Sequence, residues 1–524
     1  MALLAGIGAT VALVTISLWW YLRMPSHMPK NIPTVPFYVS SIAYFIDLGQ
    51  DQIYDRWLRE PLEKYGAVKF WVSSQWTVLL GKPEYINDLL RKDQVFPKAG
   101  NNNRIPFSVL GTFLGNNIIS AQGETWKLYT SIMKAGIQRR ITDTSKLLGR
   151  SRQLIRGLLE AQKAAGKSSG IEIESLVQMY TIFVVGEHFF QTDFESLESN
   201  EAVRLAKYQT AIRANVFSPL YFSFPILDKY PYIFRSRKRA FRIVKEYEDL
   251  LYEVVRNPRP RTVSRDSSAS GERQVIDDLR EALVCGKITE TQFRANMKIV
   301  FVAGHEDVQH LLDSALYEMG TKTAVQEKLR LEVLNTGAVD PTPEIVDSLP
   351  YLAAIVFELL RLYPPLQQLI NRKACQTAVI GDDIVISPNT LLGWTALGVH
   401  TSKAVWGDDA KQFVPERWGT TVDTIRAKFR RENARGAYIP FNAHARKCLG
   451  QGFALLQMKI MLFELVKSVE WILDPRSKMK LARHGRAALP YRMQLTIISP
   501  QGLLKPIGCK YIFKNRPGIE AKRN

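Results

Sequence analysis

Cys448 is the residue whose position in the sequence most directly suggests metal chemistry. It lies in the stretch Phe441–Gly450 (FNAHARKCLG), just before an apolar run over residues 451–469 that predicts a helix. The first turn of a helix presents unpaired backbone N–H groups and partial positive charge, which favour a thiolate over a thiol. Arg446 and Lys447 are expected to act in the same direction. Because a buried thiolate without a cation is costly, the position predicts either a plain buried thiol or a thiolate bound to a metal such as haem iron.

A second group of polar residues interrupts a long helical pattern over residues 289–319, for which Thr289 is the predicted N-cap. The centre of the pattern reads FVAGHED, in which Gly304 precedes three polar residues. A glycine inside a helix costs about 1 kcal/mol relative to alanine, so the small residues suggest a notch against which a flat ligand lies. Glu306 and Asp307 would then pass protons to that ligand. The alternative is a kinked helix whose acids are solvated.

Glu358 and Arg361 have the spacing of an ion pair. They are three residues apart on a predicted helix, so their side chains lie on one face. An exposed ion pair of this kind is worth less than about 1 kcal/mol. The surrounding residues are apolar and predict burial, and a buried pair needs a further partner. Arg417, in the segment PERW, supplies a second arginine.

Three segments read as irregular structure. Residues 99–117 are rich in glycine and asparagine and form a long predicted loop, which is uncommon in a compact domain unless it is functional or mobile. Arg104 in this loop is either a solvated arginine or a clamp for a substrate carboxylate. Residues 217–234, rich in aromatic residues and proline, are core packing or an apolar channel lip that faces a membrane. Residues 257–274 predict a polar surface loop.

Composition limits the classes of function. The chain has 524 residues, of which 46% are hydrophobic, and its length allows roughly two to four domains or one large α-rich domain. Its net charge of +20 fits an anionic membrane surface or an acidic partner protein as well as nucleic acid. No nucleic-acid-binding motif is present, so nucleic acid is not an expected partner. The four cysteines show no paired spacing, which argues for a reducing compartment and against a disulfide scaffold or a zinc site.

The N-terminal segment predicts a membrane anchor. Residues 2–22 are uncharged and almost wholly apolar, and a helix of this length reaches roughly 31 Å, enough to cross the hydrocarbon core. A cleaved signal peptide is the alternative, but the run is too long, no basic region precedes it and no clear cleavage site follows. Arg23 and Lys30 follow the run, so the rest of the chain is expected on the cytoplasmic side. We therefore predict a transmembrane anchor over residues 1–23 and a stiff proline-rich linker over residues 24–40.

Four motifs together resemble those of the cytochrome P-450 family, in the family's order and at its spacing. Residues 441–450 (F-x-x-H-x-R-x-C-x-G) are similar to the haem-binding loop F-x-x-G-x-R-x-C-x-G, and AGHED is similar to A-G-x-[DE]-T. The other two correspond to E-x-x-R and P-E-R-[FW]. The chain departs from the family at His444, where a glycine usually forms a tight bulge, although histidine adopts positive φ at modest cost. It also departs at Asp307, which replaces a threonine that usually steadies dioxygen, and at Thr130, which replaces the arginine of W-x-x-x-R.

The resemblance implies a mainly α fold with a smaller β region, namely a triangular, α-rich haem domain over residues 41–524 behind the N-terminal transmembrane helix. It implies haem b as cofactor, with Cys448 as the axial ligand of the iron. Glu358, Arg361 and Arg417 would lock the segment behind the haem loop. The residues expected at the remaining positions around the cofactor are Arg446, Arg372, Trp126 and Phe441, and Lys127 is a candidate for the missing propionate partner. The residues expected beside dioxygen are Gly304, Glu306 and Asp307. The residues expected to bind substrate are Arg104, Gln367 and Gln368.

Within the family, segments such as PKNIPTVPFYVS (29–40), FVAGHE (301–306) and PERWGTTVDTIR (415–426) look like the fungal branch that oxidises N-formyl-tyrosine and couples two phenols into dityrosine for the ascospore wall. The implied function is a monooxygenase or oxidase of a tyrosine-derived phenol in spore-wall or secondary-metabolite biosynthesis. No flavin or nucleotide motif is present, so a separate NADPH–cytochrome P-450 reductase is the expected electron donor. Its predicted docking residues are Lys127, Lys134, Arg431, Arg435 and Lys447, although a solvated charged face is the alternative. The expected location is the endoplasmic reticulum membrane, with a single span and a cytoplasmic catalytic domain.

Three other functions fit the same residues. One is a hydroxylase of an unrelated lipophilic metabolite. The second is a haem-thiolate isomerase or dehydratase, which would need no reductase. The third is a catalytically silent haem binder, suggested by the departures at Thr130, Asp307 and His444.

Overall fold

The structure is a computed structural model of the 524-residue chain. It describes residues 2–40, 50–192, 194, 201–216, 218–256, 273–477 and 509–516, without the side chains of residues 2–5, 50 and 219. A terminal strand, which the sequence predicts over residues 488–498, lies outside the described residues, as does most of the loop predicted over residues 257–274.

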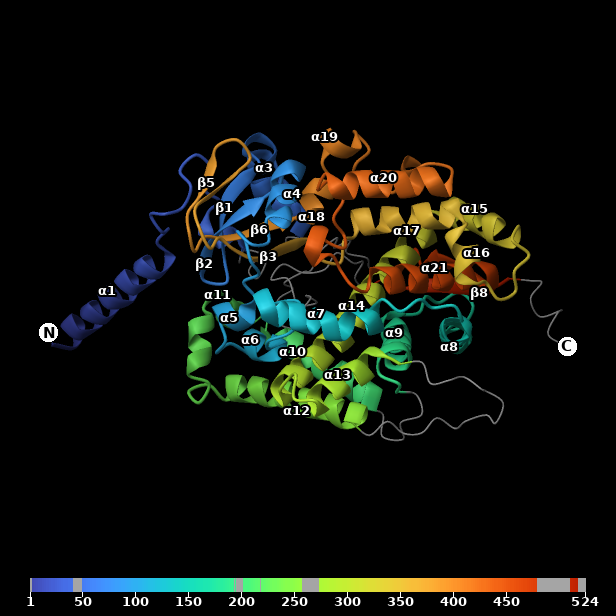
Figure 1. Ribbon diagram of the computed structural model, residues 1–524, viewed down its shortest axis with the longest axis horizontal. Coiled ribbons are helices and arrows are strands. Elements are labelled where there is room, and N and C mark those ends of the chain that lie inside the picture. The colour runs from blue at the N-terminus through green and yellow to red at the C-terminus, as the bar shows by residue number, and fades with distance from the viewer. Residues whose placement is uncertain are drawn as a thin grey trace.

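The described chain is mainly helical, with a smaller β region, as predicted (Figure 1). The α-helices are α1 (Ala2–Leu22), α2 (Gln50–Ile53), α3 (Arg59–Tyr65), α4 (Pro83–Arg91), α5 (Asn101–Arg104), α6 (Val109–Leu114), α7 (Gly123–Ile137), α8 (Ser145–Ala165), α9 (Glu174–Phe189), α10 (Glu201–Val216), α11 (Pro219–Ser223), α12 (Arg235–Arg256), α13 (Val275–Val284), α14 (Glu290–Thr321), α15 (Thr323–Leu334), α16 (Pro343–Asp347), α17 (Pro350–Leu362), α18 (Ala396–His400), α19 (Lys403–Trp406), α20 (Val422–Ala434) and α21 (Gln451–Ser468). Short 3₁₀ or π segments are η1 (Phe37–Ser40), η3 (Tyr54–Leu58), η4 (Pro225–Lys229), η5 (Pro415–Trp418) and η6 (His444–Arg446).

Within the described residues, the β region consists of three sheets. The largest has the strand order β1-β2-β6-β3, with bounds β1 Ala67–Val72, β2 Gln75–Leu80, β6 Leu391–Thr395 and β3 Gln368–Lys373. The smaller sheets pair β4 (Ala378–Ile380) with β5 (Ile384–Ile386) and β7 (Val469–Leu473) with β8 (Tyr511–Asn515). The sequence predicts strands over residues 68–76 and 77–80, with a turn at Ser73-Ser74-Gln75, and the antiparallel pairing of β1 with β2 confirms this hairpin. Its turn residues Ser73 and Ser74 adopt positive φ angles of 48° and 66°.

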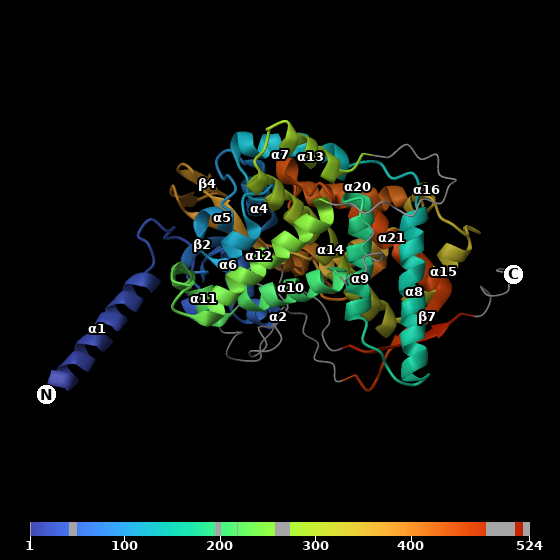
Figure 2. The ribbon, with the colours of Figure 1, turned by 90° about the horizontal axis from the view of Figure 1, so that it is seen from below.

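The long helix α14 runs through the middle of the helical body and packs against α9, α12, α13, α17 and α21 (Figures 1 and 2). Thr289 caps it as predicted, because its side chain accepts the backbone N–H of Gln292 at 3.3 Å while the Gln292 side chain accepts the N–H of Thr289 at 2.8 Å. Most of its side chains are buried in the main apolar core. Residues on α14 are therefore held rigidly at the centre of the molecule.

A buried network fixes the segment that precedes the Cys448 loop. Arg361 donates to both oxygens of Glu358, with distances of 2.8 Å from Nε and 2.7 Å from Nη2, and both side chains are 0% exposed. Arg417 donates to the same carboxylate at 2.8 Å, and the indole N–H of Trp418 donates to it at 3.0 Å. Arg361 also donates to the carbonyl oxygen of His400 at 2.6 Å. The partner that the buried pair requires is thus present, and the network joins α17 to η5 and α18.

The proline-rich segment after α1 is more than a spacer. Met28, Ile32 and Val35 are buried, and the backbone N–H of Val35 donates to the carbonyl oxygen of Lys69 on β1 at 2.9 Å. From about residue 28 onward, the segment is therefore packed as part of the body of the protein. Among the residues whose side chains the structure describes, no helix combines the length and the hydropathy that a membrane span requires.

The predicted loop over residues 99–117 contains the two short helices α5 and α6. Ser108 caps α6 by accepting the backbone N–H of Gly111 at 2.9 Å.

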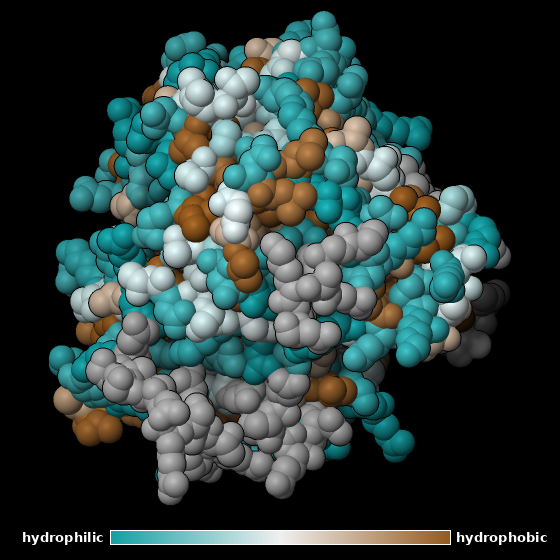
Figure 3. Space-filling view, turned by 90° about the vertical axis from the view of Figure 1, so that its right-hand side faces the viewer, coloured by the Kyte–Doolittle hydropathy of each residue, from teal (hydrophilic) through white to brown (hydrophobic). Residues whose placement is uncertain are grey.

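The end of the molecule opposite α1 is covered mainly by hydrophilic residues, with smaller hydrophobic patches between them (Figure 3). The two termini of the described chain lie at different ends of the molecule (Figure 1).

The buried network predicts a large loss of stability in the variant Glu358→Ala. Removing the carboxylate leaves Arg361 and Arg417 without a counter-charge in the interior, and the free energy of unfolding is expected to fall by about 3–5 kcal/mol. Denaturant unfolding of the variant measures this loss. The matched control is Glu124→Ala, which removes an exposed partner of Lys127 and should change the free energy by less than about 1 kcal/mol. Equal losses in the two variants would contradict a structural role for the network.

Candidate active site

The loop that carries Cys448 is held in a tight turn before α21. The backbone N–H of Cys448 donates to the carbonyl oxygen of Phe441 at 2.9 Å, which brings the two ends of the loop together. His444 adopts a positive φ of 56°, a conformation that histidine reaches at modest cost, and Asn442 a φ of 63°. The His444 ring is 2.6 Å from Asn87 Oδ1 on α4, so the residue that replaces the usual glycine also ties the loop to a neighbouring helix.

The Cys448 sulfur lies in a hollow of about 1320 Å³ that its own loop helps to line. The side chain is exposed toward this space, yet enough protein surrounds the sulfur for burial to raise the pKa of the thiol to about 11. The backbone N–H groups of Gly450 and Gln451 and the charge of Lys447 act in the opposite direction, as the sequence predicts, but they do not compensate. Arg446, by contrast, turns away from the sulfur toward other partners. A thiolate here therefore needs a cation that the described chain does not supply.

Glu306 faces α10. It is buried, and its carboxylate accepts hydrogen bonds from Gln209 and Arg213 of that helix. The neighbouring His305 ring contacts Gln209 Oε1 at 3.1 Å and the carbonyl oxygen of Phe301 at 2.6 Å, and burial lowers its pKa to about 4. The sequence did not point to Gln209 or Arg213, which lie about a hundred residues before their partners.

Asp307 faces the sulfur side of α14. Its negative charge is one of the influences that raise the pKa of Cys448, which places the carboxyl near the sulfur. Burial raises the pKa of Asp307 to about 7, and the charge of Glu306 contributes. Near neutral pH the Asp307 carboxyl is therefore divided between a form that donates a proton and a form that accepts one.

Gly304 lies at the contact of α14 with α9. A Cβ atom at this position would come within 3.0 Å of Val185 Cγ2. The missing side chain therefore allows the two helices to pack closely, and this contact explains the glycine without a ligand on that face.

A cluster of three cations surrounds one carboxylate beside the loop. Arg372 and Arg446 both donate to Asp93, Arg446 at 3.2 Å, and the guanidinium of Arg446 lies 4.0 Å above the ring of Trp126. Lys98 is buried in the same cluster, held there because the backbone N–H of the next residue pairs with the strand that carries Arg372. Burial lowers the pKa of Lys98 well below its usual range, and the two arginine charges add to this.

The cluster fits the carboxylates of haem. Nitrogens Nε and Nη2 of Arg372 and Nη1 of Arg446 are buried without a hydrogen-bond partner among the described residues. Against the one acid, Arg372, Arg446 and a protonated Lys98 carry a surplus of two positive charges, which the two negative charges of the haem b propionates would balance. Buried guanidinium groups are normally paired, so these donors indicate a dianionic ligand edge. Lys98, Arg372, Arg446 and Trp126 are the residues that would hold it.

Lys127, the candidate for the missing propionate partner, is not in this cluster. It is exposed and pairs with Glu124 at 2.7 Å, three residues earlier on the same helix. That interpretation of Lys127 was wrong, since the helix turns its side chain outward. Thr130, which replaces the usual arginine, contributes no charge, and Lys98 brings a cation to the cluster from a different segment.

The predicted substrate residues lie near β3. Arg104 on α5 donates to Gln75 Oε1 at 3.0 Å and to the carbonyl oxygen of Ile370 at 3.3 Å, while its Nη2 is buried without a partner among the described residues. Burial lowers its pKa to about 10. Gln367 and Gln368 are both buried at the start of β3. No carboxylate of the described chain pairs with Arg104.

The expected docking residues for a reductase divide into two sets. Lys134 and Lys447 line the hollow next to Cys448. Arg431 and Arg435 instead pair with Glu432, and Lys127 pairs with Glu124. Arg139, Arg140 and Arg426 also line the hollow, and no sequence motif marks them as docking residues.

Comparison with known proteins agrees with this geometry. The family model described as cytochrome P450 matches residues 33–497. The cytochrome P450 monooxygenase xanG of Aspergillus fumigatus is 46% identical over 463 residues, which cover 88% of this chain and 86% of that protein. Cytochrome P450-DIT2 of Saccharomyces cerevisiae is 34% identical over 462 residues, with coverage of 88% and 91%. The chain, with its cysteine loop, its central helix α14 and its buried E-x-x-R network, belongs to the cytochrome P450 family of haem-dependent monooxygenases.

Proposed function

We propose that this cytochrome P450 oxidises or couples a tyrosine-derived phenol that carries a carboxylate. The observation that carries the proposal is the unpaired donor of Arg104, a buried cation without a carboxylate partner among the described residues. We propose a phenol as the reacting group because several segments resemble the dityrosine-forming branch. Biosynthesis of a spore wall or of a secondary metabolite is the setting that we propose.

The residues around the cofactor are assigned distinct tasks. Cys448 would hold the haem iron through its sulfur, and Lys98, Arg372 and Arg446 would hold the propionates. Haem with a thiolate ligand supplies the reduction of dioxygen and the cleavage of its O–O bond. Asp307 is the proposed proton donor, while Glu306 is held by Arg213 and acts on Asp307 through its charge.

The overall reaction balances with one NADPH. Coupling of two phenols removes one hydrogen from each ring and forms one bond between them, and dioxygen takes up these hydrogens together with two electrons and two protons to give two waters. Hydroxylation instead places one oxygen atom in the product and one in water. Members of this family typically take their electrons from a reductase, and we propose that a separate NADPH–cytochrome P-450 reductase docks over the hollow lined by Lys134 and Lys447.

We also propose that α1 anchors the protein in the endoplasmic reticulum membrane with a single span and a cytoplasmic body. The support is the uncharged sequence of its 21 residues and the exposure of apolar side chains such as Val14 and Trp20. A helix of this length reaches roughly 31 Å. Figure 1 shows α1 standing apart from the body. Resistance of the protein to alkaline carbonate extraction from microsomes tests the anchor.

The substrate proposal is tested with N-formyl-tyrosine, reductase and NADPH. Arg104→Gln is expected to raise KM for N-formyl-tyrosine roughly 10- to 100-fold, because a charge-assisted hydrogen bond to the carboxylate is lost. N-formyl-tyramine, which lacks the carboxylate, is the matched control and should show the same KM with both proteins. Absence of any NADPH-dependent product from N-formyl-tyrosine would exclude this substrate class. Turnover without NADPH would instead favour an isomerase or dehydratase.

Haem retention tests the assignment of Lys98. Lys98→Met is expected to speed haem transfer to apomyoglobin roughly 10-fold or more, since one charged partner of the propionates is lost. The same variant should stabilise the haem-free protein against denaturant, because a buried, repelled cation is removed. Lys127→Met is the matched control, and neither measurement should change. Equal haem transfer rates for the two variants would remove Lys98 from the cofactor site.

The pH dependence of turnover tests Asp307. The protonated carboxyl is the donor, so NADPH-coupled product formation should fall as the pH rises through about 7. Asp307→Asn is expected to lose this inflection and about 100-fold of the rate on its acid side. Glu306→Gln should keep the inflection but shift it to lower pH, because the charge that helps to raise the pKa of Asp307 is gone. An unchanged profile in Asp307→Asn would show that the protons arrive by another route.

A further inference from the structure

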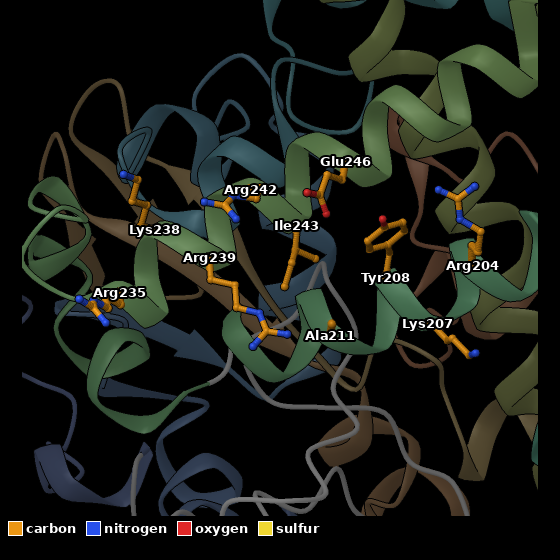
Figure 4. Close-up of a pocket in the computed structure, with 10 residues that line it drawn as sticks. All are labelled: Arg204, Lys207, Tyr208, Ala211, Arg235, Lys238, Arg239, Arg242, Ile243 and Glu246. Carbon is orange, nitrogen blue, oxygen red and sulfur yellow. The ribbon is translucent and has the colours of Figure 1, made fainter.

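A basic cavity between α10 and α12 is separate from the haem site. It has a volume of about 650 Å³, and Figure 4 shows the side chains that line it. Six of these are cationic: Arg204 and Lys207 from α10, and Arg235, Lys238, Arg239 and Arg242 from α12. One carboxylate, Glu246, lies among them, and Tyr208, Ala211 and Ile243 provide a less polar wall. We call this cavity the basic groove.

The six cations of the basic groove make no side-chain hydrogen bond or ion pair with any residue that the structure describes. Buried arginines of the same two helices behave differently, since Arg213 pairs with Glu306 and Arg237 pairs with Asp228. Cations gathered around one cavity repel one another and raise the local concentration of anions. The groove is therefore complementary to a ligand with several negative charges.

An apolar surface adjoins the groove. The segment between α10 and α12 exposes large apolar side chains, among them Leu220 at 50%, Ile233 at 60% and Tyr232 at 73%. Arg235, the first residue of α12 and a lining residue of the groove, follows this segment directly. Apolar and aromatic side chains beside a row of cations are typical of a surface that meets the headgroup region of a bilayer.

The same surface lies at the end of α1. The ring of Tyr21 on α1 is 5.4 Å from that of Phe224, between α11 and η4, and Trp76 donates to the carbonyl oxygen of Leu22 at 2.9 Å. Figures 1 and 2 both place α11 at the end of the body from which α1 extends. A bilayer that holds α1 would therefore meet the apolar segment and the adjacent end of the groove together.

We infer that the basic groove binds the phosphorylated headgroup of an anionic membrane lipid. This inference rests on the proposed membrane attachment and adds a second contact to it. A single helix followed by a linker leaves the body free to rotate about the attachment point, whereas a headgroup bound in the groove fixes one orientation. The apolar segment favours a lipid over a soluble phosphate ester, because the ester would contact the cations alone.

The full-length protein in a neutral detergent can be titrated with dioctanoyl phosphatidylinositol bisphosphate by calorimetry. The variant Lys238→Gln/Arg239→Gln/Arg242→Gln is expected to bind roughly 100-fold more weakly than the unaltered protein. The matched control is Arg156→Gln/Lys163→Gln/Lys167→Gln, which removes the same charge from exposed positions on and just after α8, far from α11 in Figures 1 and 2. It should bind within about threefold of the unaltered protein, since salt screens distant charges.

Three outcomes would overturn the inference. The first is equal affinity of the two triple variants. The second is equal affinity of the unaltered protein for dioctanoyl phosphatidylcholine, which would show that charge does not select the ligand. The third is equally tight binding of free inositol bisphosphate, which would assign the groove to a soluble phosphate ester. The titration does not depend on insertion of α1, so a failed anchor and a failed groove are distinguishable, and the carbon monoxide difference spectrum verifies that each variant retains its haem site.

Discussion

Two unbalanced charges inside the protein govern the arrangement of its active site. On one side of the site lies Cys448, whose thiolate is disfavoured by burial. On another side lies a surplus of positive charge at Lys98, Arg372 and Arg446, which Asp93 neutralises only in part. Each imbalance is costly in a desolvated interior. A flat ligand with a cationic centre and two anionic substituents relieves both, and haem b has this distribution of charge. The fold must therefore keep the sulfur and the three cations at one fixed separation.

The rest of the structure maintains that separation. Arg446 belongs to the cysteine loop and Arg372 to β3, and Asp93 accepts hydrogen bonds from both, so one acid joins the loop to the sheet. The network of Glu358, Arg361 and Arg417 holds the chain that enters the loop from the other direction. Since these contacts connect the helical body to the β region, the site is part of the framework of the fold rather than an addition to its surface.

Local sequence signals predicted much of this structure, and long-range contacts account for what they missed. The N-cap at Thr289 and the hairpin turn at Ser73 depend on neighbouring residues and were predicted, whereas the residue type at His444 only permitted its positive φ. The place of Lys98 depends on pairing of its segment with β3, which no local pattern reveals. Lys127 was misread for the opposite reason, because its partner Glu124 is local and turns the lysine outward.

The pairing of Glu306 with Arg213 has a consequence for the replacement of threonine by Asp307. A threonine hydroxyl donates and accepts a hydrogen bond without changing its charge, whereas an aspartate must be protonated to donate. Burial alone raises the pKa of Asp307, and the nearby charge of Glu306 raises it further. Arg213 holds the Glu306 side chain in place, so a contact from α10 influences the pKa of Asp307 on α14. Movement of α10 that displaced Glu306 would therefore change the pKa of Asp307, which couples the helix that borders the basic groove to the residue near the Cys448 sulfur.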